Sequence, residues 1–229
     1  MSALRGEARI AWAIARKDAL AEARGRQGAI SVLFFGAVTL LLFGFALGPD
    51  SRRLAEAAPG LLWLAVVFAG VLAIGRLHLL ETDDGALDQL ATYPVARRAI
   101  YAGKALAGFG AMLALGLVVF GAVGVLYGVD VSGAWPALLL TLVLGTAGVA
   151  AVGTFYAALT VRMRAREVLL PLLMLPLLAP LLLAAVKATA AALAGDPFGE
   201  LAAWLQLLGL FDIVMLVAGA ATYGLLLEE

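Results

Sequence analysis

Six long apolar runs, almost free of charged residues, dominate the chain. They cover residues 28–47, 59–79, 101–127, 135–161, 168–191 and 201–227. About 20 apolar residues are enough for an α-helix to cross the ~30 Å hydrocarbon core of a bilayer. Of the 229 residues, 64% are hydrophobic and 14% charged, whereas soluble domains have about 45–50% apolar residues. The sequence therefore predicts an all-α polytopic membrane protein, with six transmembrane helices in one domain over 28–229.

The N-terminal segment, residues 1–27, carries six Lys and Arg residues and lacks the uninterrupted apolar core of a signal peptide. At 100° per residue, Arg5 and Arg16 share one helical stripe, and Ile10 and Ile14 lie on another side. This pattern predicts an amphipathic interfacial helix on the cytoplasmic side, leading into the first span. The alternative is a charged tail that only retains the N-terminus.

The placement of positive charge predicts the orientation of the spans. Thirteen of the 16 Lys and Arg residues precede the first span or lie near the second and fourth connections, and three lie on the other side. Cytoplasmic loops are enriched in Lys and Arg, so both termini are expected in the cytoplasm. The 16 acidic residues balance the 16 basic ones, and nothing in the net charge indicates nucleic acid.

The connection after the second span has the features of a short amphipathic helix, at about 81–94. Thr82 or Asp83 can cap it, Pro94 can end it, and Leu87 and Leu90 share one face. Such a helix can dock in a groove of a soluble partner; the alternative is an ordinary solvated loop. The candidate partner-binding residues are Glu81, Asp83, Asp84, Gly85, Leu87, Asp88, Gln89, Leu90, Tyr93 and Pro94.

Two spans carry unusual backbone residues. In the fourth span, Gly145, Gly148 and Gly153 allow close approach of helices, and we expect helix packing there. The fifth span contains three prolines, each of which removes a backbone donor, so it should be kinked or broken. The kink is either architectural or a bend that moves during a transport cycle. The prolines are Pro171, Pro176 and Pro180.

Few polar residues lie within the spans. Asp212 lies well inside the sixth span, where a carboxylate needs a partner or a cavity. Lys187 could reach it or extend outward to the interface. His78, the single histidine, lies at the cytoplasmic end of the second span, as expected of a boundary residue. There are no cysteines and no catalytic or metal-ligand constellation, so the chain by itself is not expected to be an enzyme.

Several stretches match a known family. They are Arg16-Lys17-Asp18, Leu47-Gly-Pro-Asp50, Ala58-Pro-Gly-Leu-Leu-Trp63, Asp84-Gly-Ala-Leu-Asp-Gln-Leu90 with Tyr93-Pro94 and Lys104, and Leu175-Pro-Leu-Leu-Ala-Pro180. On these residues the chain resembles the CcmB family, the haem exporter proteins B of cytochrome c maturation, which are type-2 ABC transporter permeases. The family commonly has a His-Trp pair shortly after the lysine that corresponds to Lys104, and this chain lacks it.

The resemblance implies a permease of the bacterial inner membrane whose helix at 81–94 couples it to the ATPase subunit CcmA. The chain has no phosphate-binding loop of its own, so ATP hydrolysis belongs to that partner. The implied complex includes CcmC-like and CcmD-like membrane proteins and can hold two copies of this chain. ATP hydrolysis in it drives release of the haem chaperone CcmE. Haem and ATP are handled by the complex, and no cofactor is expected to bind this chain directly.

Two other functions are compatible with the same residues. One is a generic type-2 ABC exporter of a lipid, glycan or drug, which would need a continuous polar or amphipathic cavity between two copies. The other is a structural membrane subunit with neither a cavity nor a contact with an ATPase. The spans carry too few polar residues for a hydrophilic tunnel, which favours the CcmB-like function.

Overall fold

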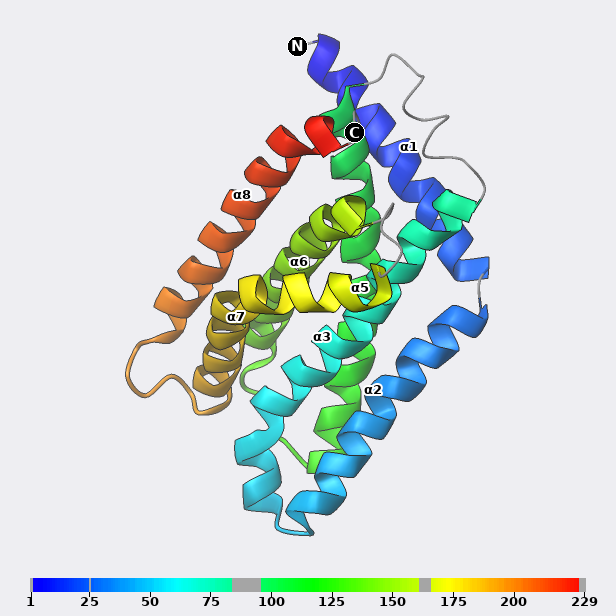
Figure 1. The fold of residues 1–229 in the computed structure, drawn as a ribbon. Helices are drawn as coiled ribbons and strands as arrows, with labels where there is room; N and C mark the ends of the chain where they lie inside the picture. The colour runs from blue at the N-terminus through cyan, green and yellow to red at the C-terminus, as the bar shows by residue number, and fades with distance from the viewer. Residues whose placement is uncertain (1, 25, 84–95, 161–165, 227–229) are drawn as a thin grey trace.

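The computed structural model describes residues 2–24, 26–83, 96–160 and 166–226. For residues 2–4, 23–24, 26–29, 76–83, 166–168 and 224–226, only the backbone is described. The described part of the chain is helical and contains no strand (Figure 1). Its helices are α1 (Ser2–Arg24), α2 (Arg26–Leu47), α3 (Ser51–Asp83), α5 (Arg97–Tyr127), α6 (Trp135–Thr160), α7 (Arg166–Leu193) and α8 (Leu201–Leu226).

Within these residues, six helices are long and apolar enough to cross a membrane, which confirms the predicted all-α fold with six spans. Their candidate spanning segments are Ile30–Leu47, Ser51–Gly75, Arg97–Tyr127, Trp135–Thr160, Leu169–Leu193 and Leu201–Tyr223. The N-terminal segment also forms the expected helix, α1.

The second spanning helix begins earlier than predicted. The sequence placed its start at Pro59, but α3 starts at Ser51 and contains Pro59 within the helix. The Asp50 carboxylate accepts hydrogen bonds from the backbone N–H groups of Arg52 (3.0 Å) and Arg53 (3.4 Å). These bonds satisfy donors that a helix start leaves free, so Asp50 starts the helix eight residues before the proline.

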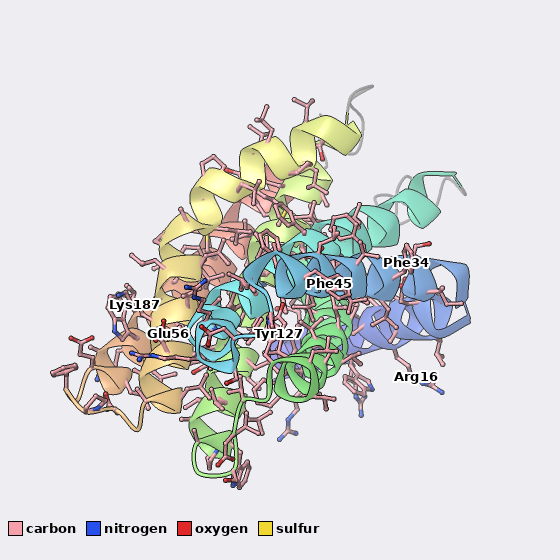
Figure 2. All side chains as sticks on the ribbon, turned by 90° about the horizontal axis from the view of Figure 1, so that it is seen from below. Arg16, Phe34, Phe45, Glu56, Tyr127 and Lys187 are labelled. Atoms are coloured by element: carbon pink, nitrogen blue, oxygen red, sulfur yellow. The ribbon has the colours of Figure 1, made fainter. Side chains whose placement is uncertain are left out.

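The helix α6 lies at the centre of the bundle, in contact with α3, α5, α7 and α8. The candidate spans of α3 and α6 are the most buried of the six, and those of α2 and α8 are among the most exposed. Figure 1 shows α2 and α8 on opposite sides of the bundle. Phe34 and Phe45 on α2, labelled in Figure 2, are largely exposed. In a bilayer such side chains face lipid, so their exposure needs no partner protein.

Most of the helix ends gather at two opposite ends of the bundle (Figure 1). One end, which we call the Arg97 end, holds the start of α1, the end of α3, the start of α5 and the end of α8. The opposite end, the Asp130 end, holds the α2–α3, α5–α6 and α7–α8 connections. An even number of spans places the two chain ends together in this way.

The three prolines of the fifth span lie inside one continuous helix, α7, which changes direction along its length (Figures 1 and 2). Of the two outcomes expected from the sequence, the helix is therefore bent and not broken. A proline removes one backbone hydrogen bond and displaces the preceding turn, and the rest of the helix can continue beyond it.

The α7–α8 connection is short. Glycines 195 and 199 and Asp196 adopt positive φ angles of 75°, 68° and 51°. The Asp196 carboxylate then accepts hydrogen bonds from the N–H groups of Glu200 (2.8 Å) and Leu201 (3.1 Å). An aspartate tolerates the left-handed region better than most residues and is a favourable cap, so this one residue turns the chain and starts α8.

Candidate functional site

The segment predicted to contact a partner joins α3 to α5. Candidate residues 84–94 lie outside the described residues. Glu81 and Asp83 belong to the last turns of α3, and only their backbone is described. Thr82 was predicted as one of two caps of a new helix, but both Thr82 and Asp83 are helical residues of α3. Residues 76–81, directly before them, contain neither glycine nor proline, so the sequence has no helix-ending residue there and α3 continues to Asp83.

The start of α5, directly after this segment, is covered by α1. Ile14 on α1 is buried, together with Ile100 and Ala105 of α5. A Cβ atom on Gly103 would lie 2.7 Å from the Ala11 carbonyl oxygen and 2.8 Å from the Ile14 Cβ. Only glycine allows this separation of the two helices. The apolar face of α1 expected from the sequence is therefore packed, at least in part, against α5.

Two ion pairs accompany this contact. The Lys104 ammonium lies 3.7 Å from the Asp18 carboxylate, with only 2% and 9% of the two side chains exposed. The Arg98 guanidinium lies 2.6 Å from the Glu7 carboxylate in a more exposed position. These pairs could not be predicted from the sequence, because each of them joins two helices that are distant in the chain. Lys104 lies inside an apolar run, and a buried charge requires a partner, so the sequence indicated that Lys104 pairs with an acidic residue without indicating which one.

Tyr101 connects α5 to both α6 and α8. Its hydroxyl lies 3.1 Å from the Ala151 carbonyl oxygen and 3.4 Å from that of Met215, positions from which it can donate to either. A Cβ atom on Gly219 would overlap the Tyr101 ring, and the ring of Tyr223 lies 5.4 Å away between centroids. Tyr101 thus fills the junction of three spans near the Arg97 end.

The glycines of α6 pack as predicted. Cβ atoms on Gly145 and Gly153 would overlap the side chains of Trp63 and Ile74 on α3. The Trp63 indole N–H donates to the Thr189 hydroxyl on α7 at 3.0 Å, and both groups are buried. Gly145 thereby makes room for an indole that links α3 to α7. Trp63 was noted in the sequence only as part of the family resemblance.

Asp212 is 6% exposed, and its carboxylate Oδ1 faces Gly148 of α6. Among the described residues, that oxygen has no hydrogen-bond partner. Lys187, labelled in Figure 2, is exposed on α7, and no ion pair joins it to Asp212 in the described part of the chain. The structure therefore does not bring together the two residues that the sequence offered as partners.

A cavity of about 560 Å³ opens at the Asp130 end. Its lining comes from the start of α3, the α5–α6 connection and the end of α7. Arg52 and Glu56 line it as a pair, with 2.9 Å between the Arg52 Nε and the Glu56 carboxylate, and Asp130 lies nearby. The cavity lies at the end opposite the α3–α5 connection and combines an apolar wall with charges of both signs.

The described residues contain no group of three or more His, Cys, Asp or Glu residues that could hold a metal ion. The side chain of His78 lies outside the described residues. In the described part of the chain, the helices pack closely on one another, and a few polar side chains form contacts where the helices meet. These features together define a class: a polytopic helical membrane protein built around a central glycine-containing span.

Comparison with known proteins identifies the family. A model of the CcmB protein family matches residues 9–225. Heme exporter protein B of Paracoccus denitrificans is 38% identical over 173 residues, which cover 74% of this chain and 78% of the relative. The protein of the same name in Bradyrhizobium diazoefficiens is 35% identical over 208 residues, covering 89% and 91%. The Pseudomonas aeruginosa counterpart is 33% identical over 192 residues, covering 84% and 85%. The chain belongs to the CcmB family, as its sequence motifs indicated.

Proposed function

We propose that this chain is the membrane permease subunit of a haem exporter that serves cytochrome c maturation. The observation that carries the proposal is the family match across residues 9–225, supported by relatives named heme exporter protein B. The six candidate spans are what a permease subunit requires. The comparisons give no support to the alternative of a generic exporter of lipids, glycans or drugs.

In the proposed complex, a separate CcmA-like ATPase subunit supplies ATP hydrolysis, and residues 81–94 are its docking segment on this chain. The topology supports this assignment, because the segment joins α3 to α5 at the end of the bundle where α1 begins and α8 ends. If the Arg97 end is cytoplasmic, as the distribution of Lys and Arg favours, the segment faces the compartment that holds ATP. CcmC-like and CcmD-like proteins complete the proposed complex, which acts in the bacterial inner membrane and releases haem-loaded CcmE.

Transmission of movement from the ATPase would pass through α5. The first turns of α5 follow the docking segment directly and carry Arg98, Tyr101 and Lys104. These three residues contact α1, α6 and α8 through the ion pairs and hydrogen bonds described above. A displacement at the start of α5 would therefore act on three other helices within two turns of the helix.

The experiment that tests the docking segment places two charges on its apolar face. Burial of a leucine contributes roughly 1.5–3 kcal/mol, and about 1.4 kcal/mol changes affinity tenfold. We expect the double variant Leu87→Asp with Leu90→Asp to insert normally, to lose the ATPase subunit in a pull-down and to lose cytochrome c maturation. Insertion should survive because the segment lies outside the apolar spans.

The matched control places two aspartates in the α5–α6 connection, as Ser132→Asp with Gly133→Asp. Both positions are exposed and lie at the opposite end of the bundle, so the ATPase should be retained. Retention of the ATPase at the wild-type yield by the Leu87 and Leu90 variant would refute the docking assignment. The structural-subunit alternative would then become the better account.

A further inference from the structure

The carboxyl group of Asp212 lies near the middle of a span. It is residue 12 of the 26-residue helix α8, far from both ends. The side chain is almost fully buried, at 6% exposure. Oδ1 is inaccessible and has no hydrogen-bond partner in the described part of the chain. The ion pairs described for this structure do not include Asp212.

The surroundings of this carboxyl group are apolar. A Cβ atom on Gly148 of α6 would lie 2.5 Å from Oδ1 and equally close to Leu181 of α7, so these two residues cover the oxygen. On α8 itself, the neighbouring turns carry Leu208 and Met215, and Leu208 is fully buried.

The titratable groups on the neighbouring helices lie elsewhere. On α5, the Tyr101 hydroxyl lies at the carbonyl oxygens of Ala151 and Met215, one turn away from Gly148 and Asp212, respectively. Lys104 is engaged by Asp18, and Lys187 of α7 is exposed. Residues 135–160 of α6 contain no charged side chain. The described elements packed around Asp212 therefore place no cation beside it.

An ionised carboxylate within a membrane span normally pairs with a cation or lines a water-filled cavity. Oδ1 of Asp212 is inaccessible and has no hydrogen-bond partner, and no cation faces Asp212 in the described part of the chain. A carboxyl group in such surroundings avoids the cost of a buried charge by binding a proton. We propose that Asp212 is an intramembrane proton-binding site, occupied by a proton when α6, α7 and α8 are packed as in this structure.

The site has a consequence for helix movement. Gly148 and Leu181 lie beside Oδ1, so separation of α6 or α7 from α8 would open this oxygen to water. An ionised Asp212 would oppose the closed packing, and a protonated one permits it. Proton uptake by Asp212 and the closing of these three helices would therefore favour each other.

The test is infrared spectroscopy of the full-length chain, with any co-purifying partners, in detergent at neutral pH. A protonated carboxylic acid has a C=O stretching band distinct from the carboxylate bands, and the band shifts in D₂O. In the spectrum of wild type minus Asp212→Asn, we expect the loss of one such band. Labelling with aspartate that carries ¹³C in its side-chain carboxyl group should shift the same band in the wild-type protein.

Asp130→Asn is the matched control. The exposed Asp130 carboxylate accepts a hydrogen bond from the Ser132 N–H at 2.9 Å, which lowers the pKa of Asp130 below its ordinary value. It is ionised at neutral pH, so its replacement should leave the protonated-acid band unchanged.

Absence of the band in the wild type, or its persistence at full intensity in Asp212→Asn, would overturn the proposal. If Asp212→Asn fails to fold, the ¹³C shift in the wild-type protein decides: no shifted acid band refutes the site. The measurement needs neither haem nor ATP, so its result is independent of the proposed export function.

Discussion

The ammonium of Lys104 on α5 lies 3.7 Å from the carboxylate of Asp18 on α1, and both side chains are almost fully buried. Removal of one partner of a buried ion pair costs about 3–5 kcal/mol where the remaining charge has no other partner. In Lys104→Met the Asp18 carboxylate keeps the Lys17 ammonium at 3.1 Å, so we expect the free energy of unfolding to fall by less than that amount, but by more than the loss of an exposed ion pair, about 1 kcal/mol. The measurement is thermal or denaturant unfolding of the purified chain in detergent.

A double variant that removes both residues of the Lys104–Asp18 pair is the control for this substitution. In Lys104→Met with Asp18→Leu no buried charge remains, so the double variant should recover part of the stability lost in Lys104→Met. Arg53→Met, which removes an exposed ion pair with Asp50, should change stability by less than about 1 kcal/mol. An effect of Lys104→Met no larger than that of Arg53→Met would show that the buried pair is not formed.

A second prediction concerns the contact between Gly145 and Trp63. A Cβ atom on Gly145 would overlap the indole ring, and overpacking of this kind costs about 1–3 kcal/mol. Gly145→Ala should therefore lower stability and disturb the hydrogen bond between Trp63 and Thr189. Trp63 is buried, so its fluorescence maximum should shift as its surroundings change.

Gly121→Ala is the comparison for this substitution. Gly121 is an exposed helical glycine with no atom within 4 Å of its would-be Cβ. Alanine is favoured over glycine in a helix by about 0.8–1 kcal/mol, so this change should be neutral or stabilising. Equal effects of the two substitutions would contradict the close packing of α6 on α3.

The six spans could be predicted from the sequence because a membrane helix leaves a long local signal of apolar residues. The start of α3 was predicted eight residues late, because a proline at a helix start is a strong signal and the Asp50 cap is a weak one. In α6, a row of glycines indicated close packing without indicating that Trp63 fills the space at Gly145.

The polar contacts were much less predictable. Lys104 and Asp18 are 86 positions apart, and their contact depends on the docking of α1 along α5. Asp212 was recognisable in the sequence as a charge inside an apolar span. Whether Lys187 could reach it depended on how α7 is rotated about its axis, and a helix that is apolar on all sides carries no pattern that indicates this rotation. The direction of the bend in α7 could not be predicted either, because three prolines indicate that a helix bends without indicating toward which side.

A third prediction concerns the bend in α7. Alanine at both Pro176 and Pro180 restores two backbone donors and removes two of the three proline rings that can bend the helix. If the bend is a fixed part of the architecture, the double variant should assemble poorly or unfold more easily, and any complex that forms should keep its coupled ATPase rate. Normal assembly with loss of coupling would instead show that the bend moves during the cycle.

A fourth prediction concerns haem. This chain has one histidine, His78, and no cysteine, so it cannot supply a pair of histidine axial ligands. We expect the isolated chain to purify without stoichiometric haem, as measured by its absorption spectrum. A haem absorption band that disappears in His78→Ala would contradict this expectation and would place a haem contact at the α3 end.

The last prediction concerns orientation. The structure gathers the start of α1, the end of α8 and the α3–α5 connection at the Arg97 end, and the other connections of α3, α5 and α8 at the Asp130 end. Thirteen of 16 Lys and Arg residues belong to the N-terminal segment and to the second and fourth connections, which the sequence assigns to one side, so the positive-inside rule predicts that the Arg97 end, which holds the second connection, is cytoplasmic. Topology reporters inserted between Asp83 and Arg98, or fused after Glu229, should therefore report the cytoplasm.

A reporter inserted at Ser132, in the α5–α6 connection, should report the opposite compartment, because this position lies one span away from the α3–α5 connection. The same compartment for Ser132 and the 83–98 insertion would contradict a spanning α5. If all three reporters gave the inverse pattern, the six spans would stand, but the segment at 81–94 would face away from ATP. The proposed docking of an ATPase on it would then fail.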